Sequence, residues 1–291
     1  MSNPKSGSAC DVKRKTKMGK PGWTGYSYNK ASKCVKDFSF ASSHGVILGK
    51  KGFLMTRQEE NKKLIELFTP CRVTDVRDGM DWMGYHHYGT MDKSIRPLYR
   101  THVVGIARTA RYIPYEGPSV TLRGDEYTQW SKDYYRDICS TRHWIQETEP
   151  GDFIAIDISG VDVGLLGSNN SLEAIKAGAV GFVLNGGGIR DTDEVIMQNV
   201  PVWCKHVSQG MDQARLRYVE KNVPVAIGGV AVYPGDVIVA DNDGVIVVPR
   251  KVAFDVAKYA CQELNGDKLG RQKLYKDLGW DLDDTVIPVE A

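Results

Sequence analysis

Residues 164–191 constrain the fold of this chain more than any other part of the sequence. The run SNNSLEAIKAG has the polar start and the spacing of a helix, with Asn170 as its predicted N-cap, Glu173 three residues later and Gly178 as its stop. The apolar run AVGFVL then predicts a buried strand, which ends at three glycines and carries Arg190 and Asp191 to its C-terminal edge. Such a unit is typical of an α/β sheet, where ligands bind at that edge.

The polar side chains of this unit suit an anionic substrate and a metal ion. Free backbone N–H groups at the start of a helix bind carboxylates, so the predicted substrate-binding residues are Gly167, Ser168, Asn169, Asn170 and Ser171. A guanidinium beside a carboxylate holds an acid and a divalent cation together, which makes Arg190 and Asp191 the candidate catalytic residues and Arg190 a further substrate-binding residue.

A structural explanation of the same residues stays open at this point. Asp191 with Glu194 is also a plausible capping pair for the helix expected in DTDEVIMQ, and Arg190 would then pair with Asp193 or Glu194. The glycines match neither the dinucleotide-binding pattern G-x-G-x-x-G nor a phosphate-binding loop that ends in G-K-[ST].

Residues 223–250 predict consecutive strands, separated by a Gly pair, a Pro-Gly-Asp turn and an Asn-Asp-Gly turn. Together with LLG at 165–167, AGAVGFVLNG at 177–186 and the Arg190-Asp191 pair, the run PGDVIVADNDGVIVVP at 234–249 resembles the RraA-like family. That family contains class II 4-hydroxy-4-methyl-2-oxoglutarate aldolases and regulators of RNase E activity. Weaker similarity at 62–84, 102–110 and 149–160 extends the resemblance over about residues 60–255.

The resemblance implies an α/β fold whose core is a mixed sheet of the swivelling β/β/α type with flanking helices. It also implies a homotrimer or homohexamer, with a site between subunits. The implied metal ligands are Asp191 and an acidic residue of the neighbouring subunit, for which Glu263 is the candidate, and the implied cofactor is a divalent cation, Mg²⁺ or Mn²⁺. Residues 61–265 form the predicted catalytic domain, with an N-terminal basic arm at 1–60 and a C-terminal tail at 266–291.

Two departures from the family pattern bear on the site. The run NGGGIRD carries one glycine more than the family spacing, which either shifts Arg190 and Asp191 or widens the turn before them. Ser168 and Asn169 stand where many members have an acidic residue, and their uncharged oxygens are weaker cation ligands.

The implied activity is a metal-dependent lyase that cleaves a C–C bond of a 2-oxo acid through a pyruvate enolate. Retro-aldol cleavage of a 4-hydroxy-2-oxo acid and decarboxylation of oxaloacetate share that enolate, and both stay open. The alternative is a non-catalytic regulatory protein that binds an RNA-degrading enzyme or another partner. A third interpretation, the same chemistry on a larger aromatic or sugar-derived acid, follows from the aromatic-rich insertion at 111–148.

The insertion contains EYTQWSKDYYRDI, whose apolar and aromatic residues recur at the spacing of an amphipathic helix. Packing against the core is its ordinary use. Arg142 and His143 also make the insertion a candidate lid or specificity element.

Composition limits the remaining possibilities. The chain has 291 residues, of which 42% are hydrophobic, enough for a sizeable core, and it contains no apolar run long enough to span a bilayer. The start lacks the apolar segment of a signal peptide, and the six cysteines form no Cys-x-x-Cys pair, so we expect a cytoplasmic protein with no membrane partner. Residues 1–51 hold 11 Lys/Arg against 2 Asp/Glu, but no nucleic-acid-reading motif accompanies them, which makes nucleic acid an unexpected partner.

Overall fold

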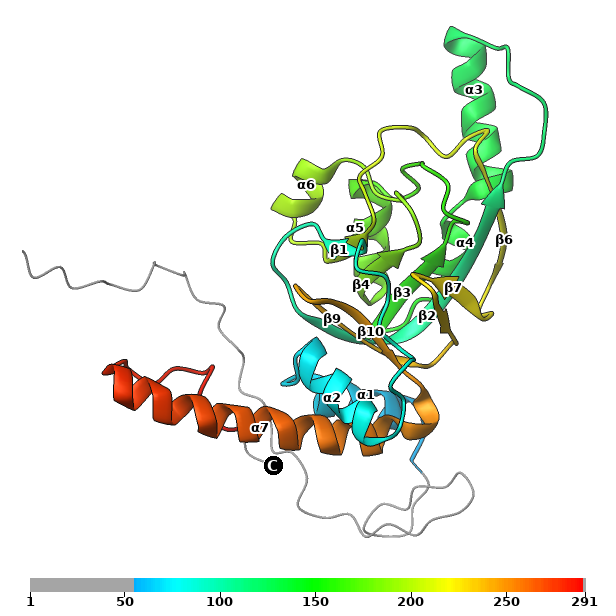
Figure 1. The fold of residues 1–291 in the computed structure, drawn as a ribbon. Coiled ribbons are helices and arrows are strands. Elements are labelled where there is room, and N and C mark those ends of the chain that lie inside the picture. Colours follow the sequence, from blue (N-terminus) through cyan, green and yellow to red (C-terminus); the bar gives the residue numbers. More distant parts are fainter. Residues whose placement is uncertain (1–54, 290–291) are drawn as a thin grey trace, which may run out of the picture. The chain divides into compact units, whose positions relative to one another are not determined.

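A mixed eight-stranded sheet is the centre of the computed structural model, which describes residues 55–289 (Figure 1). The basic arm predicted at 1–60 lies almost wholly outside these residues. The strands of the sheet are β1 (Arg96–Pro97), β2 (Val103–Pro114), β3 (Asp152–Asp157), β4 (Ala179–Leu184), β5 (Val202–Cys204), β6 (Leu216–Lys221), β9 (Val237–Asp241) and β10 (Gly244–Val248).

The strand order combines a parallel half with an antiparallel half. The order is β1-β5-β4-β3-β2-β9-β10, with β6 paired to the far end of β2. Strands β2, β3, β4 and β5 are parallel, whereas β1, β6, β9 and β10 pair antiparallel to their neighbours. Arg96 of β1 donates to the carbonyl oxygens of Asn242 (3.1 Å) and Asp243 (3.0 Å) in the β9–β10 turn, so the two ends of the strand path meet and the sheet is nearly closed.

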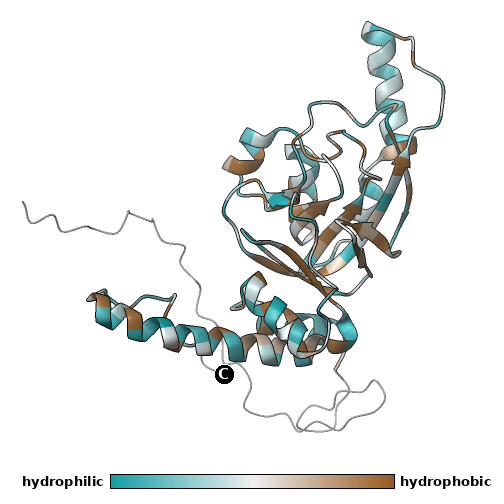
Figure 2. Cartoon of the chain, viewed as in Figure 1, coloured by the Kyte–Doolittle hydropathy of each residue, from teal (hydrophilic) through white to brown (hydrophobic). Residues whose placement is uncertain are grey.

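Apolar sequence explains why these strands are central. The AVGFVL run predicted as a strand is β4, and β10 (GVIVV) is buried at every position; such continuous runs are typical of strands covered on both faces. Strands β9 and β10 are accordingly brown in Figure 2. A hairpin of β7 (Val225–Ile227) and β8 (Val230–Val232) covers one face, and its two-residue turn uses Gly228 and Gly229 at φ of 55° and 79°, as this kind of tight turn requires.

Three helices form a layer against β2, β9 and β10: α1 (Arg57–Phe68), α2 (Val73–Trp82) and α7 (Ala253–Leu278), which follows the short 3-10 turn η2 (Arg250–Val252) (Figure 1). Thr56 caps α1 in a capping box with Glu59. Helix α7 continues past residue 265, and residues 280–289 fold back along it, where Asn265 exchanges hydrogen bonds with the backbone of Val289.

The other helices lie around the parallel strands. They are α5 (Ser168–Ala177), α6 (Thr192–Met197), and the helices of the insertion, α3 (Gly124–Tyr134), the π-helical turn η1 (Tyr135–Cys139) and α4 (Arg142–Ile145). The predicted amphipathic helix of the insertion is therefore present, although β2 runs on to Pro114 before the insertion leaves the sheet. The outer turns of α3 are hydrophilic (Figure 2).

The structure has the predicted α/β fold class: a nearly closed mixed sheet with flanking helices and a helical insertion. The four cysteines in the described region are free thiols. Within residues 55–289, none of the helices has an apolar stretch long enough to cross a membrane.

Candidate functional site

The turn after β4 brings Arg190 and Asp191 to the start of α5. Leu166 N donates to Gly188 O (2.7 Å), and Arg190 N donates back to Leu166 O (2.9 Å), so the two segments are hydrogen-bonded side by side. Gly186 and Gly188 have φ of 136° and 83°, in the region that favours glycine. The additional glycine thus lies within the turn, and Arg190 and Asp191 remain next to Gly167.

Asp191 has an unusual backbone and an unusual side-chain partner. It precedes α6 in the left-handed conformation (φ 56°, ψ 42°), and its side chain makes no capping hydrogen bond to that helix. Instead, Asp191 Oδ2 accepts a hydrogen bond from Ser168 N at 3.2 Å, at the start of α5. Asp191 is thus the N-cap residue of α6, as the structural alternative placed it, but the capping pair with Glu194 is not formed. Non-glycine residues held at positive φ are concentrated at functional sites.

Gly167 allows this close approach. A Cβ atom at position 167 would lie 2.3 Å from Asp191 Oδ2, well inside van der Waals contact. Gly167 is also the N-cap of α5, in an extended conformation, so the predicted N-cap Asn170 is wrong and lies inside the first turn. Helix α5 ends at Gly178, as expected.

Arg190 is positioned to bind an anion. Its Nε lies 3.9 Å from Asp191 Oδ1 and has no hydrogen-bond partner, although this atom is buried. The described residues show no ion pair from Arg190 to Asp193 or Glu194, contrary to the structural alternative. Buried donors without a partner are costly, so this guanidinium edge is a natural place for a ligand oxygen.

The remaining predicted binding residues differ in where their side chains lie. Asn169 and Asn170 line a cleft together with Gly167, Arg190 and Asp191. Ser168 contributes its backbone N–H to Asp191. Ser171 is fully buried, and its hydroxyl donates to the carbonyl oxygens of Gly167 and Ser168, so it supports the helix start and does not line the cleft.

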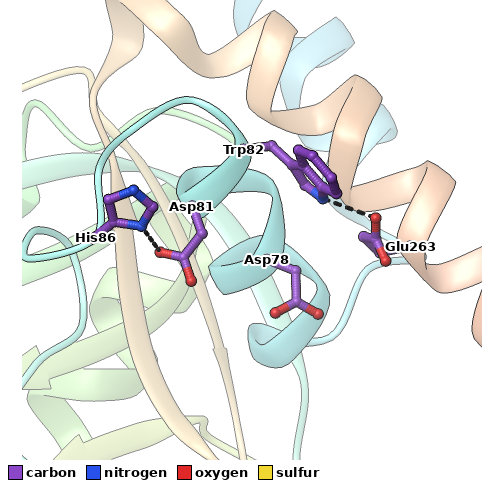
Figure 3. A pocket seen from close by; sticks show the side chains of 5 residues that line it. All are labelled: Asp78, Asp81, Trp82, His86 and Glu263. Atoms are coloured by element: carbon purple, nitrogen blue, oxygen red, sulfur yellow. Dashed lines mark hydrogen bonds and ion pairs between the residues drawn. The ribbon is translucent and has the colours of Figure 1, made fainter.

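Glu263 lies in a different pocket of the same chain. Figure 3 shows it on α7, where its Oε1 accepts a hydrogen bond from Trp82 Nε1 at 2.8 Å. The other residues around this pocket of about 470 Å³ are Asp78, Asp81 and His86, and His86 Nδ1 lies 3.3 Å from Asp81 Oδ1. The structure of one chain therefore does not bring Glu263 to Asp191.

Sequence reasoning missed two residues of the Asp191 cleft, Asp212 and Gln213. Both are largely buried, and Gln213 Oε1 has no hydrogen-bond partner. Asp212 Oδ2 accepts a hydrogen bond from the Cys139 thiol at 3.1 Å; burial raises the pKa of Asp212, while the nearby charge of Arg190 opposes that rise. No local motif marks Asp212, because its burial depends on the distant insertion.

The insertion forms the other half of this cleft of about 660 Å³. Its lining residues are Ser131, Lys132, Tyr135, Arg136, Ser140, Arg142, His143 and Gln146. The sequence singled out Arg142 and His143, and both line the cleft. His143 is also a packing residue, since its ring stacks on Tyr218 with centroids 4.6 Å apart.

The donor set of the cleft fits a hydrated divalent cation. The described residues contain no group of three or more His, Cys, Asp or Glu side chains that would enclose a metal. Asp191 offers one half-exposed carboxylate, whose Oδ1 lies beyond hydrogen-bond distance from Arg190. One or two carboxylates with retained waters are what Mg²⁺ usually takes from a protein.

Residues 71–247 match the family model RraA-like, described as Aldolase/RraA. The chain belongs to the RraA-like family. A relative from Halalkalibacterium halodurans, named "Putative 4-hydroxy-4-methyl-2-oxoglutarate aldolase", is 33% identical over 211 residues, which cover 72% of this chain and 85% of the relative. The Legionella pneumophila protein DlpA is 26% identical over 189 residues, but the match covers 64% of this chain and 28% of DlpA.

A solved structure shares the RraA-like fold. RraAS2 of Streptomyces coelicolor, described as "an unusual member of the RNase ES inhibitor RraA protein family", matches with a TM-score of 0.58 and 25% identity. The match covers 72% of this chain and 96% of RraAS2.

Another relative, from Thermus thermophilus, is named 4-hydroxy-4-methyl-2-oxoglutarate aldolase. It is 30% identical over 118 residues, which are 40% of this chain and 70% of the relative.

Proposed function

We propose that this protein is a metal-dependent carbon–carbon lyase, which cleaves a 2-oxo acid and releases pyruvate. The observation that carries the proposal is the conformation of Asp191. Its strained backbone turns the carboxylate away from its own helix and toward the start of α5, beside an Arg190 guanidinium whose Nε has no partner. The same conformation places one carboxylate and one guanidinium at the same cleft, an arrangement suited to an acid substrate and a cation.

The residues of the cleft divide the work of binding. The backbone N–H groups of α5 near Asn169 and Asn170 face the substrate carboxylate, because helix N-termini carry free donors and a partial positive charge. Arg190 binds the ketone oxygen, which gains negative charge as the adjacent C–C bond breaks. Its hydrogen bond therefore strengthens toward the transition state, which is the requirement for catalysis.

Asp191 holds the cofactor in this proposal. A divalent cation, Mg²⁺ or Mn²⁺, would add Lewis-acid stabilisation of the same ketone oxygen when it is bound. In retro-aldol cleavage the C3–C4 bond breaks, the 4-hydroxyl loses its proton, and C3 of the enolate takes up a proton to give pyruvate. In oxaloacetate decarboxylation the same electron pair is left on C3 when CO₂ departs.

Glu263 has a place in this proposal only across a subunit interface. Its pocket is acidic and separate from the Asp191 cleft of its own chain. We propose a homotrimer or homohexamer in which Glu263 of one subunit approaches Asp191 of the next and completes the surroundings of the cation.

The direct test is pyruvate release from oxaloacetate and from 4-hydroxy-4-methyl-2-oxoglutarate, with Mg²⁺ or Mn²⁺ and with EDTA. Turnover that requires the cation and is lost in Asp191→Ala and Arg190→Ala is the expected result. Asp193→Ala, which changes an exposed carboxylate two residues away, is the matched control and should retain turnover. Absence of turnover on both acids with either metal would refute the lyase proposal for these substrates.

A regulatory function is the second candidate, favoured by the similarity in fold to RraAS2. In that case the protein binds an RNA-degrading enzyme through its surface and needs no chemistry at Asp191. Inhibition of such an enzyme that persists in Asp191→Ala would support regulation, and inhibition that disappears with this substitution would argue against a surface-only role.

A further inference from the structure

The insertion is a fixed wall of the Asp191 cleft, because its base is packed into the main core. Trp144 is fully buried, and its Nε1 donates to Tyr112 Oη at 2.9 Å. Tyr134 Oη donates to Leu216 O at 2.7 Å, and Cys139 is fully buried. Buried hydrogen bonds of this kind hold an element in one position, so we expect η1 and α4 to stay in place when a ligand binds.

Tyr135 joins this wall to the substrate-binding end of α5. Its hydroxyl lies 2.7 Å from Thr141 Oγ1 and 3.3 Å from Asn170 Oδ1. Four side chains of η1 and α4 therefore line the same cleft as the α5 N-terminus, Arg190 and Asp191: Tyr135, Arg136, Arg142 and His143. A ligand held at its head by Arg190 and Asp191 would extend toward the insertion.

Two arginines of the insertion, Arg136 and Arg142, differ in how closely carboxylates neutralise their charge. Arg136 makes hydrogen bonds to Asp137 Oδ1 and Oδ2 (both 2.7 Å) and to Asp133 Oδ1 (2.8 Å), so its own neighbours neutralise it. Arg142 has a single distant counterion in the described residues, Glu173 Oε1 at 3.9 Å from its Nε, and its side chain is 66% exposed. An exposed ion pair at that distance is weak, so the planar donor edge of Arg142 is available.

We propose that Arg142 is a second anion-binding residue of the cleft, which pairs with the remote carboxylate of a dicarboxylic 2-oxo acid. This inference rests on the proposed function, whose named substrates are diacids, and assigns the residue of this chain that recognises their second carboxylate. A guanidinium binds a carboxylate through two parallel hydrogen bonds. A methyl group at the same place makes no hydrogen bond to Arg142, so Arg142 adds nothing to the binding free energy of a monoacid. Specificity for the diacid therefore comes from the insertion.

A matched pair of ligands tests this subsite. 2-Oxoglutarate and 2-oxopentanoate have the same 2-oxo acid head and the same chain length, and they differ in a terminal carboxylate against a methyl group. We would measure binding of both to the full-length protein with Mg²⁺ by calorimetry, using the wild type, Arg142→Gln and, as the control from the same wall, Arg136→Gln. Thermal unfolding of each variant checks that the fold is retained.

The wild type is expected to bind 2-oxoglutarate about tenfold more tightly than 2-oxopentanoate, the size of effect typical of a charge-assisted pair that is partly exposed. Arg142→Gln should remove this preference and leave the affinity for 2-oxopentanoate unchanged, while Arg136→Gln should keep the preference. Equal binding of the two acids by the wild type, or an equal loss in both variants, would overturn the subsite alone. Binding of neither acid by the wild type would also overturn the subsite, whereas the proposed function fails only if pyruvate release from its own substrates is absent.

Discussion

The two pockets of this chain have opposite electrostatic character. The cleft at Asp191 combines one exposed carboxylate with Arg190, Arg142 and the first turn of α5. The pocket at Glu263 gathers three carboxylates, those of Asp78, Asp81 and Glu263, with one histidine and a tryptophan. The first pocket is suited to an acid substrate but offers few metal ligands. The second is rich in carboxylates, and the arginine beside it, Arg77, is paired with Asp81 at 2.8 Å.

Among the described residues, the Asp191 cleft therefore lacks the carboxylates that the Glu263 pocket has, and the Glu263 pocket lacks a side chain that would bind an acid substrate. A cation-assisted reaction on an anionic substrate needs both carboxylates and positive side chains. Because the two pockets lie on different layers, around α5 and around α2 and α7, one chain alone does not join them. An assembly that brings the α2–α7 layer of one copy to the Asp191 cleft of another would supply both.

The largest expected loss of activity comes from a substitution that displaces the Asp191 carboxylate. Gly167→Ala places a methyl group 2.3 Å from Asp191 Oδ2 and must displace that carboxylate. A shift of about 1 Å in a reacting group costs on the order of 100-fold in rate, so kcat/KM for pyruvate release should fall by about that factor. Gly266→Ala on α7 is the control: open space surrounds its Cβ, and the helix should gain about 0.5–1 kcal/mol with activity unchanged. Full activity in Gly167→Ala would show that the position of Asp191 is not critical.

The next effect concerns the acidic pocket. If Glu263 completes the site of a neighbouring subunit, Glu263→Gln should lower kcat by about 10- to 100-fold, as for other groups that support a bound metal. Mixed oligomers of Glu263→Gln and Asp191→Asn should regain part of the activity, since some sites then combine two intact residues. Asp277→Asn, on the last turns of the same helix, should have no effect. Wild-type kcat in Glu263→Gln would show that the Asp191 cleft works without the second pocket.

A smaller effect, on the free energy of unfolding, is expected from replacing the buried acid Asp212. Burial raises the pKa of Asp212 above its ordinary value of 3.8, so the stability associated with its protonated form is present at low pH and is lost as pH rises through the folded-state pKa. Asp212→Asn should therefore raise the free energy of unfolding on the order of 1 kcal/mol at pH 8 and progressively less toward pH 4. Chemical denaturation at several pH values measures this, and the gain should be insensitive to salt because the group is buried. A gain that is the same at every pH would assign it to packing.

The smallest effect belongs to Asp78 of the acidic pocket. Partial burial and then neighbouring carboxylates, with Glu263 first among them, raise the pKa of Asp78. Asp78→Asn should stabilise the protein by a few tenths of a kcal/mol at pH 8, and the gain should disappear as pH falls toward the ordinary pKa of 3.8. High salt should reduce this gain, unlike that of Asp212→Asn. If salt changed the stability gain of Asp78→Asn and of Asp212→Asn equally, the two raised pKa values would not have different causes, burial with charge repulsion at Asp78 and burial at Asp212.

Local patterns predicted most of the fold. Periodicity and glycine positions located α5, β4 and the four strands between residues 223 and 250, because these elements are decided by neighbours in sequence. The N-cap of α5 was predicted wrongly for a long-range reason. Ser168 N donates to the Asp191 side chain, which comes from a distant segment. The helix therefore begins at Ser168, directly after Gly167, and needs no capping side chain from Asn170.

The candidate site was predictable only in part. Arg190, Asp191 and the α5 residues lie within one supersecondary unit, so their spacing indicated that they meet. Asp212 joins the cleft through Cys139, and Glu263 faces Trp82, which are contacts between distant segments. No periodicity or motif encodes such contacts, and the π-helical turn that aims Tyr135 at Asn170 has no sequence signal either.

Strand β2 connects the three hydrophobic clusters of the chain. Val104 and Ile106 belong to the cluster under α1, α2 and α7, Ala107 to the cluster under the β7–β8 hairpin, and Ala110 and Tyr112 to the cluster that holds the insertion. Its partners β3, β6 and β9 come from distant parts of the sequence, so β2 gains its contacts only after long loops have closed, the slow step of folding in sheets with non-local pairing. If this pairing is part of the transition state, substitutions in β2 should slow refolding more than they accelerate unfolding, which stopped-flow refolding of β2 variants would measure.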